Sequence, residues 1–346
     1  MKDILKSFLY DYNEDEILYK QYYDYLKKGK TYRDLINDMN GDYSYYIKRI
    51  TPESKGGFLP NVISDSNFFR GEDSNNIVIT KHNRFTPVFE HEHQLFEMIY
   101  VLKGSCLQHI SHTDITLKAG QFCLVAPNSV HSISVFDDSI VLNILIRQST
   151  FEDIFYNVLR RTNAISTFFN NSLYTNNKNT YLLIDTNRDA EIKEYVLNML
   201  CEYLEKKKYY EDVLDGSILM LFSKLLQRYE NNIVLSDAIA NSSSDFTTML
   251  AYISDNYDSI TLSELASHFN FSEGYCSRLI KKNTGKSFTQ LLQNIRFKMA
   301  TFFLLNTNKT IAEISEDIGY TNVEHFNRLF KKNFNITPGN YRKDNK

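Results

Sequence analysis

The 346-residue sequence lacks the features that mark membrane-spanning, exported or zinc-stabilised proteins. Its longest apolar stretches, such as residues 141–146, are far too short to cross a bilayer. The segment from Asp3 to Glu16 is acidic and has no apolar run, so we expect no secretory signal. The four cysteines are scattered, with no Cys-x-x-Cys pair, which argues against a structural zinc site and for reduced thiols. We therefore expect a cytoplasmic protein with no membrane partner.

Positive charge is scarce in the whole chain, whose formal net charge is −3, but its distribution is uneven. Residues 247–346 hold 13 Lys and Arg against 9 Asp and Glu, a net charge of +4, whereas the remainder holds 26 against 33, a net charge of −7. A basic C-terminal domain on an acidic body fits double-stranded DNA as a partner. A chain of this length is also expected to form two or three domains.

The spacing of apolar residues divides the sequence into four predicted regions. Residues 1–75 form a tyrosine-rich extension that is partly helical, with a helix ending near Gly29 that either packs on the protein or offers a partner surface. Residues 76–150 alternate with period two, which is typical of a β-barrel. Residues 151–240 return to helical spacing and are predicted to form a linker or dimerisation region. Residues 241–346 are predicted to form an all-α DNA-binding domain.

Short strands and long helices are expected in the two middle regions. Two apolar helices, at 191–204 and 214–226, either form a dimer interface or pack internally. Six strands are expected between turn residues, at 77–79, 95–102, 115–117, 122–125, 133–136 and 140–146.

The C-terminal region contains an internal repeat. Thr261 and Glu264 return 49 residues later as Thr310 and Glu313, each pair directly ahead of an apolar periodic run. This is the pattern of a capping box, in which the hydroxyl and the carboxylate satisfy free N–H groups at the start of a helix. Asn or Gly follows each short helix, as a tight turn between helices requires.

A second helix is expected after each turn, capped by Ser272 or Thr321 and ending near Gly285 or Asn335. Both second helices end in Lys-Lys-Asn, and their early outward residues are polar. Helices of this kind suit the major groove, where small polar or arginine side chains contact bases and lysines contact phosphates. The predicted DNA-binding residues are Gly274, Ser277, Arg278, Lys281, Asn322, Val323, Glu324, Asn327, Arg328 and Lys331.

The two copies differ in length. The second copy has one extra residue, Asn322 or Val323, between its turn and Arg328. We therefore expect the two recognition helices to present their arginines at different helical positions, and the binding site to be asymmetric.

The second copy resembles a known family. Residues 311–320, 326–332 and 336–342 are similar to the second helix-turn-helix of the AraC/XylS transcription regulators, with Asn335 where that family usually has Gly. The resemblance covers residues 246–342. It implies a regulator that activates transcription through RNA polymerase. We also expect a homodimer whose N-terminal domain senses a small-molecule effector or sets the geometry of the dimer.

A further resemblance lies in the β-rich region. His91, His93 and Glu97, followed by Gly104, match the first cupin motif in spacing, and on one strand the three would face the same side. His131 resembles the last residue of the second cupin motif, although the glycine of that motif is missing. Three alternatives remain for the four side chains. They form a metal-free ligand pocket or are structural histidines, they form a metal-assisted sensor, or they form a metalloenzyme site. No bound cofactor is expected.

These patterns predict an α+β multidomain protein: a cupin-like β-barrel N-terminal domain with helical extensions, and an all-α double helix-turn-helix C-terminal domain. The predicted function is sequence-specific transcription regulation, with no catalytic residues and no enzyme activity. The alternative is a metal-dependent cupin enzyme or metal sensor fused to a DNA-binding domain. A third reading is an oligomerising protein that binds no ligand.

Overall fold

The computed structural model describes residues 2–31, 34–35, 62–63, 69, 76–148, 163–175, 177, 179–240 and 244–345. Much of the tyrosine-rich extension and the start of the predicted C-terminal domain at 241–243 lie outside the described residues. The chain divides into two compact units. The N-terminal unit contains 1–151 and 178–236, and the C-terminal unit contains 152–177 and 237–346.

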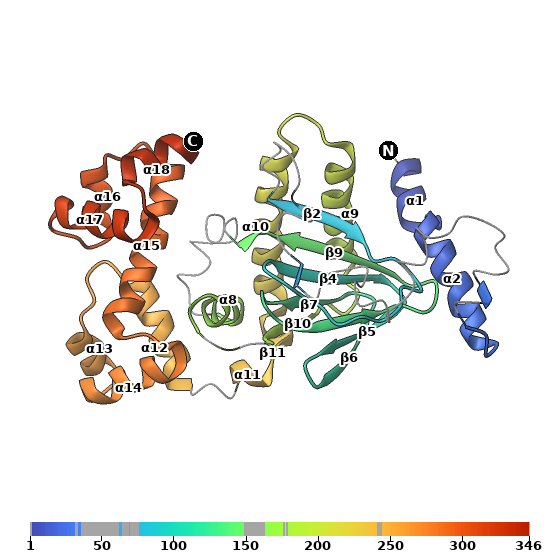
Figure 1. The fold of residues 1–346 in the computed structure, drawn as a ribbon, viewed down its shortest axis with the longest axis horizontal. Coiled ribbons are helices and arrows are strands. Elements are labelled where there is room, and N and C mark those ends of the chain that lie inside the picture. The colour runs from blue at the N-terminus through green and yellow to red at the C-terminus, as the bar shows by residue number, and fades with distance from the viewer. Residues whose placement is uncertain are drawn as a thin grey trace. The chain divides into compact units, whose positions relative to one another are not determined.

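The N-terminal unit is built on two β-sheets (Figure 1). The larger sheet has the strand order β11-β10-β7-β4-β9-β2 and the smaller has the order β6-β5-β8, all antiparallel, while β1 and β3 form a parallel pair. The strands are β1 (Val62–Ile63), β2 (Ile77–Lys81), β3 (Glu92–His93), β4 (Phe96–Lys103), β5 (Ser105–Ile110), β6 (Thr113–Lys118), β7 (Gln121–Val125), β8 (His131–Ser134), β9 (Ile140–Ile146), β10 (Tyr181–Asp185) and β11 (Ile233–Leu235).

The two sheets share one core. Ile99 of β4 lies opposite Cys123 of β7, and these side chains pack in one cluster with Cys106 and Ile133 of the smaller sheet. Since alternate residues of a strand point to opposite faces, Glu97 shares the inner face with Ile99. The even-numbered residues of β4 face the other way and are also buried, because helices cover that outer face.

Helices α9 (Ala190–Glu205) and α10 (Tyr210–Tyr229) pack against each other and against β2, and α10 also contacts β10. The predicted apolar stripe of α9 is buried except for Tyr203, which is half-buried. Helix α10 buries Leu214, Ile218, Leu221, Phe222 and Leu225. The buried stripes of these two helices therefore pack internally and do not form a dimer interface.

The tyrosine-rich start of the chain forms α1 (Lys2–Tyr10) and α2 (Glu14–Lys27), with Gly29 just beyond the end of α2 as predicted. Helix α2 docks on the barrel through Glu16, which is fully buried and bonds to Arg84 and Lys81 at 2.8 and 2.9 Å. The ring of Tyr23 stacks on that of Phe136. The described part of the extension is therefore a packed accessory element.

The described part of the C-terminal unit is all helical. It consists of α8 (Ala164–Tyr174), α11 (Asp237–Ala240), α12 (Ser244–Asp255), α13 (Leu262–His268), α14 (Glu273–Thr284), α15 (Phe288–Asn306), α16 (Ile311–Asp317), α17 (Val323–Phe334) and α18 (Pro338–Asn345). Its core gathers buried side chains from α12 through α17 around α15. None of the described helices combines the length and the apolar character that crossing a bilayer requires.

The described residues of 151–240 do not form the single helical linker that the sequence predicted. Helix α8 packs against α12 in the C-terminal unit, whereas β10 and β11 complete the larger sheet beside β7. Strand β10 has alternating burial, but five residues between two helices give a weak periodic signal. Strand β5 was also not predicted, because its polar Gln108 and His109 interrupt the apolar pattern.

Candidate nucleic-acid interface and buried histidine cluster

The first helix of each repeat is fixed by the predicted capping box. The Thr261 hydroxyl accepts the Glu264 N–H at 3.2 Å, and the Glu264 carboxylate accepts the Thr261 N–H at 2.8 Å. Thr310 and Glu313 form the same pair of bonds at 3.2 and 2.6 Å. Helices α13 and α16 therefore begin alike, and each is seven residues long.

The second helices, α14 and α17, are each 12 residues long and bury Cys276 and Ile280, or Phe326 and Phe330. Ser272 caps α14 as predicted. The predicted cap Thr321 is wrong for α17, which is capped by the following residue. The Asn322 side chain accepts the His325 N–H at 2.8 Å, because the turn of the second copy is one residue longer.

The predicted difference in arginine position is also wrong. Helix α14 begins at Glu273 and α17 begins at Val323, so Arg278 and Arg328 are both the sixth residue of their helices. The extra residue of the second copy lies in its turn, before the helix starts. Asymmetry of the predicted binding site is therefore expected from the side chains of the two helices and from the longer second turn, and not from the positions of the arginines.

Arg296 of α15 connects the two helix-turn-helix units. Its guanidinium donates to the carbonyls of Tyr257 at 2.7 Å, Asp258 at 3.0 Å and Gly319 at 3.1 Å. The first two carbonyls precede α13, and the third belongs to the turn after α16. This side chain therefore holds the second turn against the segment that leads into the first unit.

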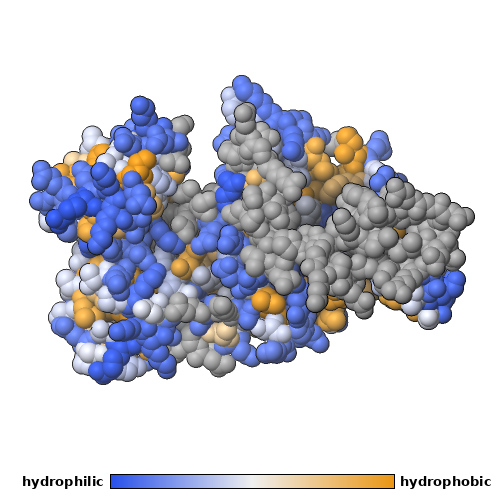
Figure 2. All heavy atoms as spheres, viewed as in Figure 1, coloured by the Kyte–Doolittle hydropathy of each residue, from blue (hydrophilic) through white to orange (hydrophobic). Residues whose placement is uncertain are grey.

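The predicted DNA-binding residues lie along α14 and α17, and most are exposed. Ser277, Val323 and Asn327 are half-buried, and the others, Gly274, Arg278, Lys281, Asn322, Glu324, Arg328 and Lys331, are exposed. Figure 2 shows a mostly hydrophilic surface over the C-terminal unit on the face turned to the viewer. Contact between these predicted residues and DNA stays a prediction.

Two exposed aromatic side chains were missed. Tyr275 and His325 are each the third residue of their helices, and a His325 ring nitrogen lies 3.1 Å from Nη2 of Arg328. Aligning the copies from Gly285 and Asn335, both left-handed at the helix end, would have shown this equivalence.

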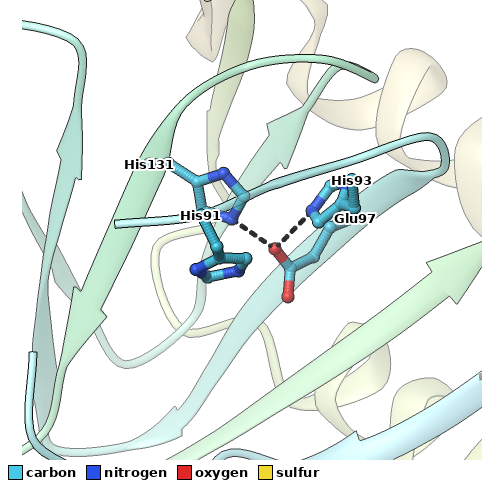
Figure 3. A group of neighbouring side chains, drawn as sticks. All are labelled: His91, His93, Glu97 and His131. Carbon is cyan, nitrogen blue, oxygen red and sulfur yellow. Dashed lines mark hydrogen bonds and ion pairs between the residues drawn. The ribbon is translucent and has the colours of Figure 1, made fainter. Parts of the chain in front are cut away.

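The four predicted pocket residues come together inside the barrel (Figure 3). One carboxylate oxygen of Glu97 lies 2.9 Å from Nε2 of His131 and 3.2 Å from Nε2 of His93. The His91 ring lies beside that of His131, with a centroid distance of 4.4 Å. Glu97, His93 and His131 are buried, and His91 is half-buried. The side chains thus form one cluster with an edge toward the surface.

The prediction that His91, His93 and Glu97 share one strand is wrong. Strand β3 ends at His93, residues 94–95 form a bend, and β4 begins at Phe96. In a straight strand His93 and Glu97 would lie about 13 Å apart along the chain, too far to bond. The bend is therefore what brings them together.

The missing glycine of the second cupin motif does not displace His131. Asn128, three residues before it, has φ +59°, a left-handed conformation that Asn adopts more readily than most residues. The Asn128 N–H also donates to the His93 carbonyl at 2.7 Å. The turn before β8 is thereby fixed against the segment that carries His93.

The electrostatics of the cluster follow from burial and pairing. Burial alone would raise the pKa of Glu97, but hydrogen bonds with His131 and His93 hold that pKa well below its ordinary value. Burial opposes the charged form of His131, yet bonding to Glu97 raises the pKa of His131. Burial lowers the pKa of His91 to about 3, so this ring is a neutral donor of a lone pair at physiological pH.

Comparison with known proteins gives two family models that match the chain. The AraC-like ligand binding domain matches residues 79–164, and a helix-turn-helix domain matches residues 265–344. The first match contains the histidine cluster, and the second contains α14 and α17.

Curated relatives are transcription regulators. The transcriptional activator RhaS of Escherichia coli O81 is 22% identical over 254 residues, which cover 73% of this chain and 87% of RhaS. YtdP of Bacillus subtilis, a transcriptional regulator, is 39% identical over 83 residues, which cover 24% of this chain and only 11% of YtdP. Among solved structures, ToxT of Vibrio cholerae with a bound unsaturated fatty acid gives a TM-score of 0.32 at 18% identity, covering 77% of this chain and 94% of ToxT.

Proposed function

We propose that this chain, which belongs to the AraC family of DNA-binding transcription regulators, binds a specific operator by placing α14 and α17 in the major groove and activates transcription there. One observation carries the proposal. Arg278 and Arg328 are exposed at the same position of two helices that share caps, lengths and basic ends.

The test uses DNA fragments selected from a random pool by the full-length protein. Arg278→Ala and Arg328→Ala should each weaken binding to the selected sequence by about 1–3 kcal/mol, roughly 5- to 150-fold, because an arginine on a base edge contributes that much. Binding is measured by fluorescence anisotropy at fixed salt, since affinity depends on ionic strength.

Lys193→Ala is the matched control, because Lys193 is exposed on α9 in the other unit. It removes one positive charge and should leave the affinity within about twofold. Equal affinities for the wild type and both arginine variants would contradict the assignment of these helices.

Activation through RNA polymerase and control by a small-molecule effector are parts of the same proposal. The similarity to RhaS, a transcriptional activator, supports activation, and the match to a ligand-binding domain over 79–164 supports an effector bound in the barrel. The chain then works as a sensor without catalytic turnover. This differs from the metalloenzyme alternative, which predicts product formation that is lost in the His91→Ala variant.

We also propose that the regulator is a homodimer that pairs through α10. Val213 and Met220 lie one heptad apart on this helix and are 47% and 50% exposed, although both are apolar. Such exposed positions are favourable once a second copy covers them.

Met220→Glu should therefore shift the protein from dimer to monomer, because the carboxylate would be buried in the interface without a partner. Size-exclusion chromatography with light scattering measures the mass. Lys193→Glu, on the exposed side of α9, is the control and should stay dimeric. A dimer that persists in Met220→Glu would place the interface elsewhere.

A further inference from the structure

We propose that His91, His93, Glu97 and His131 form a binding site for one divalent transition-metal ion, held by three imidazole nitrogens and one carboxylate oxygen. The inference names a ligand for the sensor domain, so its regulatory meaning rests on the proposed function. The binding of metal itself is tested separately below.

The hydrogen bonds of the histidine rings determine which nitrogen of each ring is left to bind a metal ion. Nδ1 of His93 lies 2.9 Å from the Leu95 carbonyl, and Nδ1 of His131 lies 2.9 Å from the Ser129 carbonyl. Nδ1 of His91 lies 3.5 Å from the Phe89 carbonyl. Because a carbonyl only accepts, Nδ1 must carry the proton, and the neutral ring has its lone pair on Nε2. Bonds of this kind orient metal-binding histidines in proteins.

The contacts with Glu97 then need either a proton on each Nε2 or a cation shared by the ligand atoms. A carboxylate oxygen cannot donate, so two neutral Nε2 atoms at 2.9 and 3.2 Å from it would be acceptors facing an acceptor. Protonation of both rings would satisfy these contacts, but it would bury two imidazolium groups on one carboxylate. One metal ion satisfies both nitrogens and the carboxylate at once, and it also uses Nε2 of His91.

The distances suit a shared ion. With metal–ligand bonds of about 2.1 Å, neighbouring ligand atoms lie about 3.0 Å apart in an octahedral site and about 3.4 Å apart in a tetrahedral one. The two Nε2–oxygen distances, 2.9 and 3.2 Å, fall close to this range. All four ligand atoms lie within 4.8 Å of one another, so small side-chain rotations complete the site.

The chemistry of the donors selects the class of ion. Imidazole nitrogen together with carboxylate oxygen favours first-row divalent ions such as Zn²⁺, Fe²⁺, Mn²⁺, Co²⁺ or Ni²⁺. A site for Ca²⁺ or Mg²⁺ would instead be made of oxygen ligands.

The inner face beside the cluster is polar as well, which is an independent observation. Both side-chain polar atoms of Gln108 and Oδ1 of Asn143 are buried and have no hydrogen-bond partner among the described residues. Gln108 lies opposite Ile133, two residues from His131, and Asn143 lies opposite Ile99, two residues from Glu97. On these strands, residues two apart share a face. A metal-bound water or small oxygen-donor molecule beside the cluster would give these side chains partners.

The experiment measures metal bound to the full-length protein after removal of metal with a chelator. Co²⁺ and Zn²⁺ are titrated by calorimetry, and Co²⁺ also by its visible absorption, which reports nitrogen and oxygen ligands. We expect one equivalent per chain and a rise in the melting temperature, because an ion that binds the folded state alone stabilises it.

His91→Ala is the informative variant. The His91 side chain is half-buried, and its hydrogen bond to the Phe89 carbonyl is long, so the fold should persist when it is removed. Loss of a residue that only orients a ligand weakens metal binding about 10- to 100-fold, so loss of a direct ligand should weaken it at least as much. Glu97→Gln should also lose affinity, and circular dichroism checks that each variant is folded.

His109→Ala is the matched control. His109 is half-buried and lies 2.6 Å from Asp114, so it is a histidine–carboxylate pair outside the cluster. This variant should keep the full stoichiometry. The proposal is overturned if folded His91→Ala binds metal like the wild type, if His109→Ala loses it, or if the wild type binds none.

The two proposals can fail separately. Metal binding without binding to selected DNA would reject the proposed function and leave the metal site standing. DNA binding without metal binding would reject the metal site alone.

Discussion

At the scale of single residues, left-handed backbone conformations fix the turns at both candidate sites. Few side chains tolerate these conformations. Gly319 has φ +80°, and a Cβ placed there would lie 1.7 Å from the Asp258 carbonyl oxygen. Asn335 and Asn128 adopt φ of +60° and +59° without being glycine. Asn335 therefore ends α17 as Gly285 ends α14, which the sequence comparison expected.

Gly319→Ala should destabilise the C-terminal unit by about 2–5 kcal/mol, because positive φ costs about 1–2 kcal/mol and the close approach adds a steric cost. Hydrogen exchange of peptides from α16 and α17 measures the loss of protection.

Gly339→Ala is the control for this change. Outside its own helix backbone and chain neighbours, no atom of the described residues lies within 4 Å of a Cβ at Gly339, which is in α18. Alanine should therefore be neutral or stabilise by up to about 1 kcal/mol. Equal protection of α16 and α17 in both variants would show that the turn at Gly319 is not constrained as described.

At the scale of secondary-structure elements, α2 is held on the barrel by a buried ion pair. Burial by itself would raise the pKa of Glu16, but hydrogen bonds from Arg84 and Lys81 lower that pKa from 4.5 to about 2. A carboxylate whose pKa is lower in the folded state stabilises the fold above its unfolded pKa, and this stability is lost as the pH falls.

We therefore predict that α2 stays docked from pH 7 to about 5 and loosens as the pH falls from 4.5 toward 2. The depression of the Glu16 pKa corresponds to roughly 3 kcal/mol. Glu16→Gln should lose this stability already at pH 7. Hydrogen-exchange protection of α2, corrected for the intrinsic effect of pH, measures it.

Glu14→Gln is the control, since Glu14 starts α2 but is exposed. It should retain the wild-type dependence on pH. The same profile in Glu16→Gln and the wild type would mean that the ion pair does not dock the helix.

At the scale of the whole molecule, the chain passes between its two units more than once. It leaves the barrel after β9, contributes α8 to the C-terminal unit, and returns to add β10, α9, α10 and β11. Phe168 of α8 is fully buried, and α8 packs against α12. The C-terminal unit therefore includes residues that precede part of the N-terminal unit in sequence.

Phe168→Ala should destabilise the C-terminal unit by about 3–5 kcal/mol, because it leaves a cavity in a packed core. Hydrogen exchange should rise in α12 and stay unchanged in β4 of the barrel. Thr167→Ala, at a half-buried position of the same helix, should cause little change. A rise confined to β4 would assign α8 to the N-terminal unit instead.

The sequence by itself determined the fold class, the resemblance to the AraC/XylS regulators and both helix-turn-helix units, because caps, turns and apolar periodicity are local patterns. It also identified His91, His93, Glu97 and His131 by spacing. Tertiary structure alone decided three further points: the bend at 94–95 that joins His93 to Glu97, the register that places Gln108 and Asn143 beside the cluster, and the packing of α8 on α12. The last two depend on contacts between residues distant in sequence, which no local pattern encodes, and the bend at 94–95 interrupts the strand alternation from which the sequence was interpreted.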